Sequence, residues 1–328
     1  MPGYSLSGGD IGKKEMNILV TGIGGDIGIG IGRILKNSEY VDNLIGCDVH
    51  DEHAGSLIFD RCKTVPNATQ PEYLDLLNEL AANERIDAIV VTSEPELRLI
   101  SNLNVNNLAP KLPFVMANKG AMDIGFDKLK TSTLISQMQL PNPWTKLVEN
   151  EAPLNFPCIL KSRYGAGNQN VYVVKSAEEA CAYRNLFPNY IWQEYLPDDN
   201  TEYTCGVYGS NDGTFRTIIF RRRLVSGCTS FAELVENSEI ESICKKIAQK
   251  LELKGSINIQ LRLDLRGPMV FEINPRFSST VVMRHKLGFC DVEWSLQEQI
   301  LGRETKYNLL YPVGTRLCKI YDEWIYNT

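Results

Sequence analysis

The chain has 328 residues, of which 43% are hydrophobic and 23% are charged, a composition typical of a globular protein with roughly two or three domains. Its formal net charge of -6 argues against nucleic acid as a partner, because a phosphate backbone binds to basic surfaces. The sequence contains no apolar run near the ~20 residues of a membrane-spanning helix, so we expect no membrane partner.

Residues 1–15 and the cysteines favour a cytoplasmic protein. The segment 1–15 is rich in Gly, Ser and Lys and lacks the apolar centre of a signal peptide, so we expect a flexible tail, either native or a tag. The nine cysteines are dispersed without a C-x-x-C pair, which indicates reduced thiols. His50 and His53 flank two acidic residues, a pattern typical of a solvated loop.

The first part of the chain alternates short apolar strands with helices. This alternation predicts right-handed βαβ units and a parallel sheet for residues 16–112. We expect strands at 17–20, 44–47, 86–91 and 114–117, helices at 32–40 and 72–83, and a loop at 92–96.

Beyond residue 127 the pattern changes to hairpins interleaved with helices, which predicts an α+β region in two lobes. A helix at 127–138 ends before the Pro-rich segment 140–143. We expect strands at 158–161, 170–174, 190–195, 202–208 and 216–221, a helix at 238–251, and a hairpin of strands 257–265 and 269–273 with its turn at 266–268.

That last hairpin carries a distinctive set of polar side chains. Alternation along its second strand places Glu272 and Asn274 on one face, and Phe271 and Ile273 on the other. With Gln260 on the first strand, these oxygen donors suit a hard cation such as Mg²⁺ that holds a polyphosphate. Arg276 follows and suits a phosphate. The alternative is a structural hairpin whose polar groups face solvent.

A glycine loop (residues 22–28) follows the first strand. Gly22, Gly24 and Gly28 give G-x-G-x-x-x-G, one residue longer than the strict dinucleotide spacing. A strand, glycine turn and helix N-terminus favour an anion, and Asp48 at the end of the next strand could hold a ribose hydroxyl. Binding of NAD(P), binding of a carboxylate substrate and simple close packing all remain open.

Three further segments carry candidate residues. Lys161 ends a strand before a glycine-rich segment, where Gly165 and Gly167 could form a lid over phosphates; an ordinary glycine hairpin is the alternative. Glu194 and Glu202 flank a polar turn and could accept hydrogen bonds from ribose, or could lie on the surface. The basic run 221–223 could face an anionic substrate or end a solvated strand.

Taken together and in this order, residues 17–302 resemble the ATP-grasp superfamily, and most closely one synthetase unit of the carbamoyl phosphate synthetase large subunit. The resembling segments are ILVTGIGGDIG, RIDAIVVT, DKLKTSTLISQMQLPNPWT, CILKSRYGAGNQNV, WQEYLPDDNTEYT and INIQLRLDLRGPMVFEINPR. The resemblance implies a mixed α/β and α+β architecture, in which a Rossmann-like parallel-sheet domain precedes the ATP-grasp fold. The implied domains are a tail (1–15), a pre-ATP-grasp domain (16–112), an N-lobe with the lid (113–190), a C-lobe with the metal-binding hairpin (191–305) and a C-terminal extension (306–328).

The resemblance also implies roles for residues that match the family's motifs. Lys128 and Lys161 correspond to basic residues at the ATP phosphates, and Arg276 to an arginine that steadies the γ-phosphate or acyl phosphate; these three form the implied catalytic set. Gln260, Glu272 and Asn274 correspond to ligands of two Mg²⁺ (or Mn²⁺) ions. The implied ATP contacts further comprise Gly165, Gly167, Glu194, Tyr195, Leu196 and Glu202, and the candidate substrate contacts are Gly24, Gly25, Asp48, Glu94 and Arg223.

The family resemblance predicts an ATP-dependent ligase. A substrate carboxylate would become an acyl phosphate, and an amine or similar nucleophile would displace phosphate. The chain holds one unit where the synthetase has two in tandem, so full carbamoyl phosphate synthesis is not expected. The alternatives are an NAD(P)-dependent oxidoreductase that uses the glycine loop and a non-catalytic nucleotide-binding protein. We expect small-molecule partners and a possible homodimer; the sequence does not identify the carboxylate, the nucleophile or the pathway.

Overall fold

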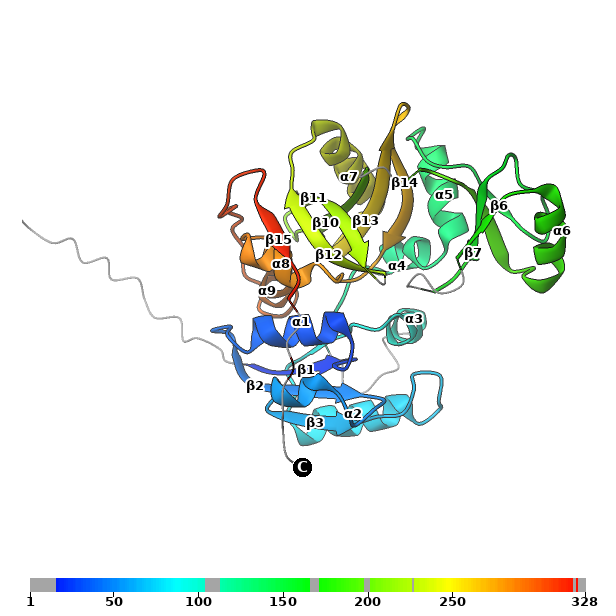
Figure 1. The fold of residues 1–328 in the computed structure, drawn as a ribbon. Coiled ribbons are helices and arrows are strands. Elements are labelled where there is room, and N and C mark those ends of the chain that lie inside the picture. Colours follow the sequence, from blue (N-terminus) through cyan, green and yellow to red (C-terminus); the bar gives the residue numbers. More distant parts are fainter. Residues whose placement is uncertain are drawn as a thin grey trace, which may run out of the picture.

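The computed structural model describes residues 16–103, 113–165, 171–197, 201–225, 227–320 and 323. Within them the strands form one five-stranded, one six-stranded and one four-stranded sheet. Figure 1 shows the five-stranded sheet and its helices as one unit, with the six-stranded sheet beyond α1 and the four-stranded sheet to the side of it. This mixed architecture confirms the predicted fold class. Among the helices in these ranges, none is long and apolar enough to cross a membrane.

The five-stranded sheet is parallel and has the order β3-β2-β1-β4-β5. Alternate residues of β1 pack on opposite faces: Ile18 and Val20 lie in the core under α1, and Leu19 lies in the core under α2 and α3. Both faces are covered, so the strands read as continuous apolar runs. The elements are β1 (Met16–Thr21), α1 (Asp26–Leu35), β2 (Val41–Asp48), the 3-10 helix η1 (Ala54–Leu57), β3 (Arg61–Thr64), α2 (Tyr73–Asn83), β4 (Ala88–Val90), α3 (Glu94–Asn102) and β5 (Phe114–Val115).

Helix α1 begins at Asp26, inside the glycine run, and not at residue 32 as we expected. The reason is packing. A Cβ atom on Gly28 would lie 2.2 Å from the carbonyl oxygen of Gly22, so the helix can approach the turn only because this residue is glycine. Gly22 itself has a φ of 63°, in the region that favours glycine. Tertiary contact therefore overrides the low helix propensity of glycine.

The six-stranded sheet is antiparallel and has the order β14-β13-β10-β11-β12-β15. Helices α4, α5 and α7 bury one face, where Ile135 and Ile243 pack against Ile259. The segment from α8 to η3 covers part of the other face. The elements are α4 (Lys119–Gly125), α5 (Lys128–Gln137), β10 (Glu202–Gly209), β11 (Phe215–Val225), β12 (Cys228–Leu234), α7 (Ser238–Lys250), β13 (Gly255–Asp264), β14 (Gly267–Asn274), α8 (Val281–Lys286), α9 (Asp291–Ser295), the π-helical turn η3 (Leu296–Ile300) and β15 (Arg316–Cys318).

The four-stranded sheet has the order β6-β9-β7-β8 and carries α6 on one face, where Ala180 packs against Cys158 and Trp192. Its elements are β6 (Thr145–Leu147), β7 (Cys158–Ser162), β8 (Tyr172–Val174), α6 (Ala177–Leu186) and β9 (Tyr190–Glu194). The limits that we expect for the individual domains stay a prediction.

The β13–β14 hairpin differs from expectation in two details. Asp264 pairs with Gly267, so the turn consists of residues 265–266 and not 266–268. Gln260 pairs with Glu272 whereas Leu261 pairs with Val270, which leaves Phe271 in a bulge. A bulge changes the direction of a side chain. The expectation that Phe271 lies opposite Glu272 is therefore wrong: both side chains face the same cavity.

Candidate active site

A cavity of about 820 Å³ is lined by residues of the six-stranded and four-stranded sheets, by the loops that follow β1 and β4, and by the start of α1. Its walls bring together side chains that are far apart in the sequence. Of the residues predicted from the sequence, the cavity is lined by Gly25, Lys128, Lys161, Gly165, Glu194, Leu196, Glu202, Gln260, Glu272, Asn274 and Arg276. Outside its lining lie Gly24, Asp48, Glu94, Tyr195 and Arg223. Gly167 lies outside the described residues.

The oxygen donors of the hairpin face the cavity together. Gln260 on β13 is directly opposite Glu272 on β14, and Asn274 lies two residues further along. Burial alone would raise the pKa of Glu272, but the positive charges of Lys128, Lys161, Arg276 and Arg222 outweigh burial and hold the pKa below its ordinary value. The carboxylate is therefore ionised at neutral pH. An ionised carboxylate beside two amide side chains fits a hard cation such as Mg²⁺.

Lys128 is held in the cavity wall by the start of α5. Asp127 caps this helix by accepting hydrogen bonds from the backbone N–H groups of Leu129 and Lys130, and it forms an ion pair with Arg163, with 2.7 Å between Oδ2 and the guanidinium nitrogen. The Lys128 N–H donates to the Arg163 carbonyl at 3.1 Å. The residue that follows β7 and the start of α5 are thus joined, which fixes the backbone position of Lys128 at the cavity wall.

Lys161 lies at the end of β7 and is only 8% exposed. Burial, with smaller contributions from the charges of Lys128 and Arg262, lowers the pKa of Lys161 to about 8, although Glu272 opposes the shift. The Lys161 ammonium lies over the Phe271 ring, 5.6 Å from its centroid. The bulge of β14 thus supplies an aromatic face for this cation.

Two further arginines, Arg222 and Arg262, line the cavity. From the sequence we named the run 221–223 but chose Arg223 from it, and we did not name Arg262. Both cavity arginines bind Glu202: Arg222 donates to Oε1 at 2.7 Å and Arg262 to Oε2 at 2.7 Å. The Glu202 carboxylate is buried, at 5% exposure, and both of its oxygens accept from arginine. The structure therefore places Glu202 where it holds two cations in the cavity wall.

Strand alternation in the run 221–223 predicts that Arg222 faces the opposite way from Arg221 and Arg223. The outer two arginines turn away from the cavity, since Arg221 pairs with Glu233 and Arg223 lies over the Phe231 ring. Period-two alternation then directs the middle residue to the cavity.

The end of β9 supplies another wall. Glu194 forms an ion pair with Arg266 of the hairpin turn, with 2.9 Å between Oε1 and the guanidinium nitrogen. Its other oxygen accepts from the Trp144 N–H at 3.3 Å. Leu196 follows it at the cavity wall. This ion pair connects the end of β9 in the four-stranded sheet to the turn of the β13–β14 hairpin.

The glycine loop forms the far end of the cavity, together with Thr92 and Ser93 at the start of α3. Asp48 lies behind the loop, where its Oδ2 accepts from the Gly24 N–H at 2.7 Å and its Oδ1 from the His50 N–H at 3.1 Å. Glu94 pairs with Arg98 one turn along α3. Its charge also acts on Arg276, whose pKa is lowered by burial and raised in part by Glu94 and Glu272.

Comparison with known proteins identifies the fold. Residues 186–316 match the family model described as "ATP-grasp in the biosynthetic pathway with Ter operon". A carbamoyl-phosphate synthase of Methanobrevibacter smithii is 23% identical over 149 residues, which is 43% of this chain and 40% of that protein. The carbamoyl phosphate synthase large chain of Helicobacter pylori is 23% identical over 82% of this chain. The chain spans only 27% of that relative's length.

Solved structures agree with this assignment. The biotin carboxylase domain of Hydrogenobacter thermophilus 2-oxoglutarate carboxylase, in complex with MgADP, ADP and bicarbonate, has a TM-score of 0.69 at 14% identity, covering 90% of this chain and 72% of that one. An L-amino acid ligase from Bacillus licheniformis has a TM-score of 0.68 at 17% identity, covering 88% and 75%. Residues 186–316 therefore match an ATP-grasp family, the chain shares the fold of these solved structures, and carbamoyl phosphate synthases are among its sequence relatives.

Proposed function

We propose that the chain is an ATP-dependent ligase that activates a substrate carboxylate as an acyl phosphate and couples it to an amine or a similar nucleophile, with release of ADP and phosphate. One observation carries the proposal. Lys128, Lys161 and Arg276 surround the ionised Glu272 in a single cavity. This arrangement combines fixed positive charge for phosphate oxygens with an oxygen donor set for a cation.

Phosphoryl transfer needs alignment and charge neutralisation more than covalent chemistry from the protein. In our proposal Lys128 and Lys161 neutralise phosphate oxygens of ATP, and Arg276 steadies the γ-phosphate as it moves to the substrate carboxylate. Gln260, Glu272 and Asn274 would hold Mg²⁺, which supplies further charge neutralisation and orientation of the polyphosphate when bound. The resemblance to the family favours two such ions.

The remaining cavity walls divide between the nucleotide and the substrate. We propose that Glu194, Leu196 and the strand end around Tyr195 contact the nucleoside, and that Glu202 acts by positioning Arg222 and Arg262. The expected lid, residues 164–167, would keep water from the acyl phosphate; Tyr164 and Gly165 line the cavity.

The substrate end is assigned to the glycine loop. Gly25 lines the cavity here, and we propose that a small carboxylate or amine substrate binds against it. Asp48 supports this loop through Gly24, and Glu94 lies close enough to influence Arg276. Because both Asp48 oxygens already accept backbone N–H groups, from Gly24 and from His50, we do not propose the nicotinamide function.

The comparisons support the reaction class and leave the substrates open. The Bacillus licheniformis neighbour is named an L-amino acid ligase, and the matching family is described as acting in a biosynthetic pathway. Since the chain spans about a quarter of the Helicobacter relative, we do not extend the synthase's whole activity to it. The Hydrogenobacter domain is described as a dimer, and a homodimer stays a proposal for this chain.

A coupled ADP-release screen tests the proposal. Purified protein with Mg·ATP would be given pairs of carboxylates and amines, including amino acids, dipeptides, sugar acids and bicarbonate, with mass spectrometry of the products. We expect ADP release that depends on one carboxylate and an amide product of the matching mass. If isothermal calorimetry shows no binding of Mg·ATP, or if ATP binds but no pair in a broad screen yields ADP, the ligase function is refuted.

A further inference from the structure

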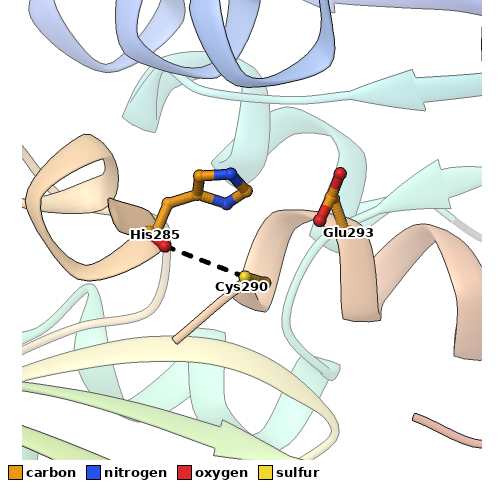
Figure 2. A group of neighbouring side chains, drawn as sticks. All are labelled: His285, Cys290 and Glu293. Atoms are coloured by element: carbon orange, nitrogen blue, oxygen red, sulfur yellow. Dashed lines mark hydrogen bonds between the residues drawn. The ribbon is translucent and has the colours of Figure 1, made fainter. Parts of the chain in front are cut away.

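Three side chains that are typical metal ligands lie together away from the cavity, at the connection between α8 and α9. They are His285, Cys290 and Glu293, and one ligand atom from each lies within 4.8 Å of the other two. Figure 2 shows His285 and Glu293 on either side, with the Cys290 thiol between and below them. None of the three lines the cavity, so the proposed ligase reaction does not account for them.

The backbone holds these residues in place. His285 lies in the last turn of α8, Cys290 precedes α9, and Glu293 lies in the first turn of α9. The connection is tight: Gly288 has a φ of 95° and donates its N–H to the His285 carbonyl at 3.0 Å. The ligand set therefore comes from one short, well-defined corner of the chain.

The neighbouring residues fix the same corner. Arg284 and Asp291 form an ion pair of 2.6 Å in which both side chains are fully buried, and they directly precede and follow His285 and Cys290 in the sequence. Asp291 is also bound by the Ser256 hydroxyl, so its carboxylate is already occupied. This buried pair joins the last turn of α8 to the start of α9, the two elements that carry the three side chains.

The His285 and Cys290 side chains make few interactions with other protein groups, as expected of side chains that bind a metal. The His285 Nδ1 atom is buried and has no hydrogen-bond partner among the described residues, which is unusual for a buried polar atom. The Cys290 thiol makes one long contact, 3.8 Å, to the His285 carbonyl. Nitrogen, sulfur and carboxylate oxygen together are the donor set of zinc sites, whereas Mg²⁺ prefers oxygen alone.

We propose that His285, Cys290 and Glu293 bind a divalent transition metal ion, with Zn²⁺ as the ion that best fits the donor set. Three protein ligands leave the fourth tetrahedral position for water or another group. The ligands would carry one thiolate and one carboxylate charge, which balance the charge of the ion. This site is separate from the proposed Mg²⁺ site in the cavity and independent of the ligase reaction.

The two helices that carry the ligands pack against different parts of the molecule. Helix α8 packs against α1 of the parallel-sheet unit, and α9 packs against β13. Ser278 and Ser279, which lie three and two residues before α8, line the cavity. An ion at this corner would fix the position of α8, which follows the β13–β14 hairpin in the sequence and packs against α1. Binding through the thiolate of Cys290 would release the thiol proton.

Cobalt titration of the metal-free protein tests the proposal. The full chain would be stripped with a chelator, dialysed into excess Mg²⁺ to occupy oxygen sites, and titrated with Co²⁺. We expect a thiolate-to-cobalt charge-transfer band that saturates at one equivalent and is abolished by Zn²⁺. Glu293→Gln and Cys290→Ser should each weaken binding by more than the roughly 10–100-fold typical of a lost outer partner, and Cys290→Ser should also remove the band.

Cys181→Ser is the matched control, because Cys181 is an exposed free thiol on α6, and it should leave the band unchanged. Circular dichroism of each variant shows whether it is folded. The proposal is overturned if the wild-type protein gives no charge-transfer band at one equivalent. It is also overturned if folded Cys290→Ser retains the band or if Cys181→Ser loses it. Should Cys290→Ser fail to fold, the wild-type stoichiometry and Glu293→Gln still decide.

Discussion

Lys128 and Glu272 form an ion pair inside the cavity, with 3.4 Å between Nζ and Oε1. The same ammonium donates to the Gly165 carbonyl at 2.6 Å. One side chain at the start of α5 thus contacts both the metal-binding hairpin and the first glycine of the expected lid. The side chains of Lys128 and Glu272 are 12% and 18% exposed, so their charges act on one another with little screening by solvent.

This relationship makes Glu272→Gln a sharp test of the site. The substitution keeps the shape of the side chain and removes the charge that holds both the proposed Mg²⁺ and the nearby cations. We expect ATP turnover to fall by roughly 10²-fold or more, the scale of losing one preorganised electrostatic contact. Steady-state ADP release measures it. Glu241→Gln, on an exposed helical pair with Lys245, should leave turnover unchanged; equal turnover in folded Glu272→Gln refutes the assignment.

Lys161 predicts a pH dependence. Because its pKa is about 8, the ammonium is present below pH 8 and is lost as the pH rises through that value. Affinity for Mg·ATP should therefore fall above pH 8. Negatively charged phosphate raises the pKa of the bound state, so binding near pH 8 takes up protons. Calorimetry in buffers of different ionisation enthalpy measures this uptake.

Two variants separate Lys161 from other titrating groups. Lys161→Arg keeps its charge throughout the range and should lose the decline above pH 8, even if its affinity is lower. Lys161→Ala should reduce ATP turnover by roughly 10²-fold. An identical alkaline decline in Lys161→Arg and the wild type would assign the titration to another group.

Glu202→Gln tests the arginine pair. The side chains of Glu202 and Arg222 are each 6% exposed, so the substitution removes the negative charge that a buried guanidinium faces. We expect the free energy of unfolding to fall by about 3 kcal/mol, as for other buried pairs that lose one member. Urea denaturation measures it. Glu241→Gln serves again as the control and should change the free energy of unfolding by at most about 0.5 kcal/mol. If the two variants lower it equally, the ion pairs of Glu202 stabilise the fold no more than an exposed pair does.

Asp48→Ala separates the two ends of the cavity. Asp48 supports the glycine loop through the Gly24 N–H and does not line the cavity. We expect a raised KM for the organic substrate found by the ADP-release screen, with the Kd for Mg·ATP unchanged. Weaker ATP binding with an unchanged KM for the organic substrate would place the nucleotide at the glycine-loop end.

The local pattern of the sequence predicts most of the elements. Apolar strands alternating with helices indicate the parallel sheet, and period-two alternation in the hairpin places Glu272 and Asn274 on one face, as the structure has them. These features depend on neighbours along the chain, so the sequence contains them directly. The capping of α5 by Asp127 is equally local.

Only the tertiary structure decides which of these side chains meet. A bulge brings Phe271 beside Lys161. Glu202 forms ion pairs with both Arg222 and Arg262. These features, and the start of α1 at Asp26, depend on contacts between distant segments. The group of His285, Cys290 and Glu293 has no familiar spacing, and a tight chain reversal assembles it. Residue type and periodicity determine what each segment can form, whereas packing and the pairing of buried charges determine where its chemistry lies.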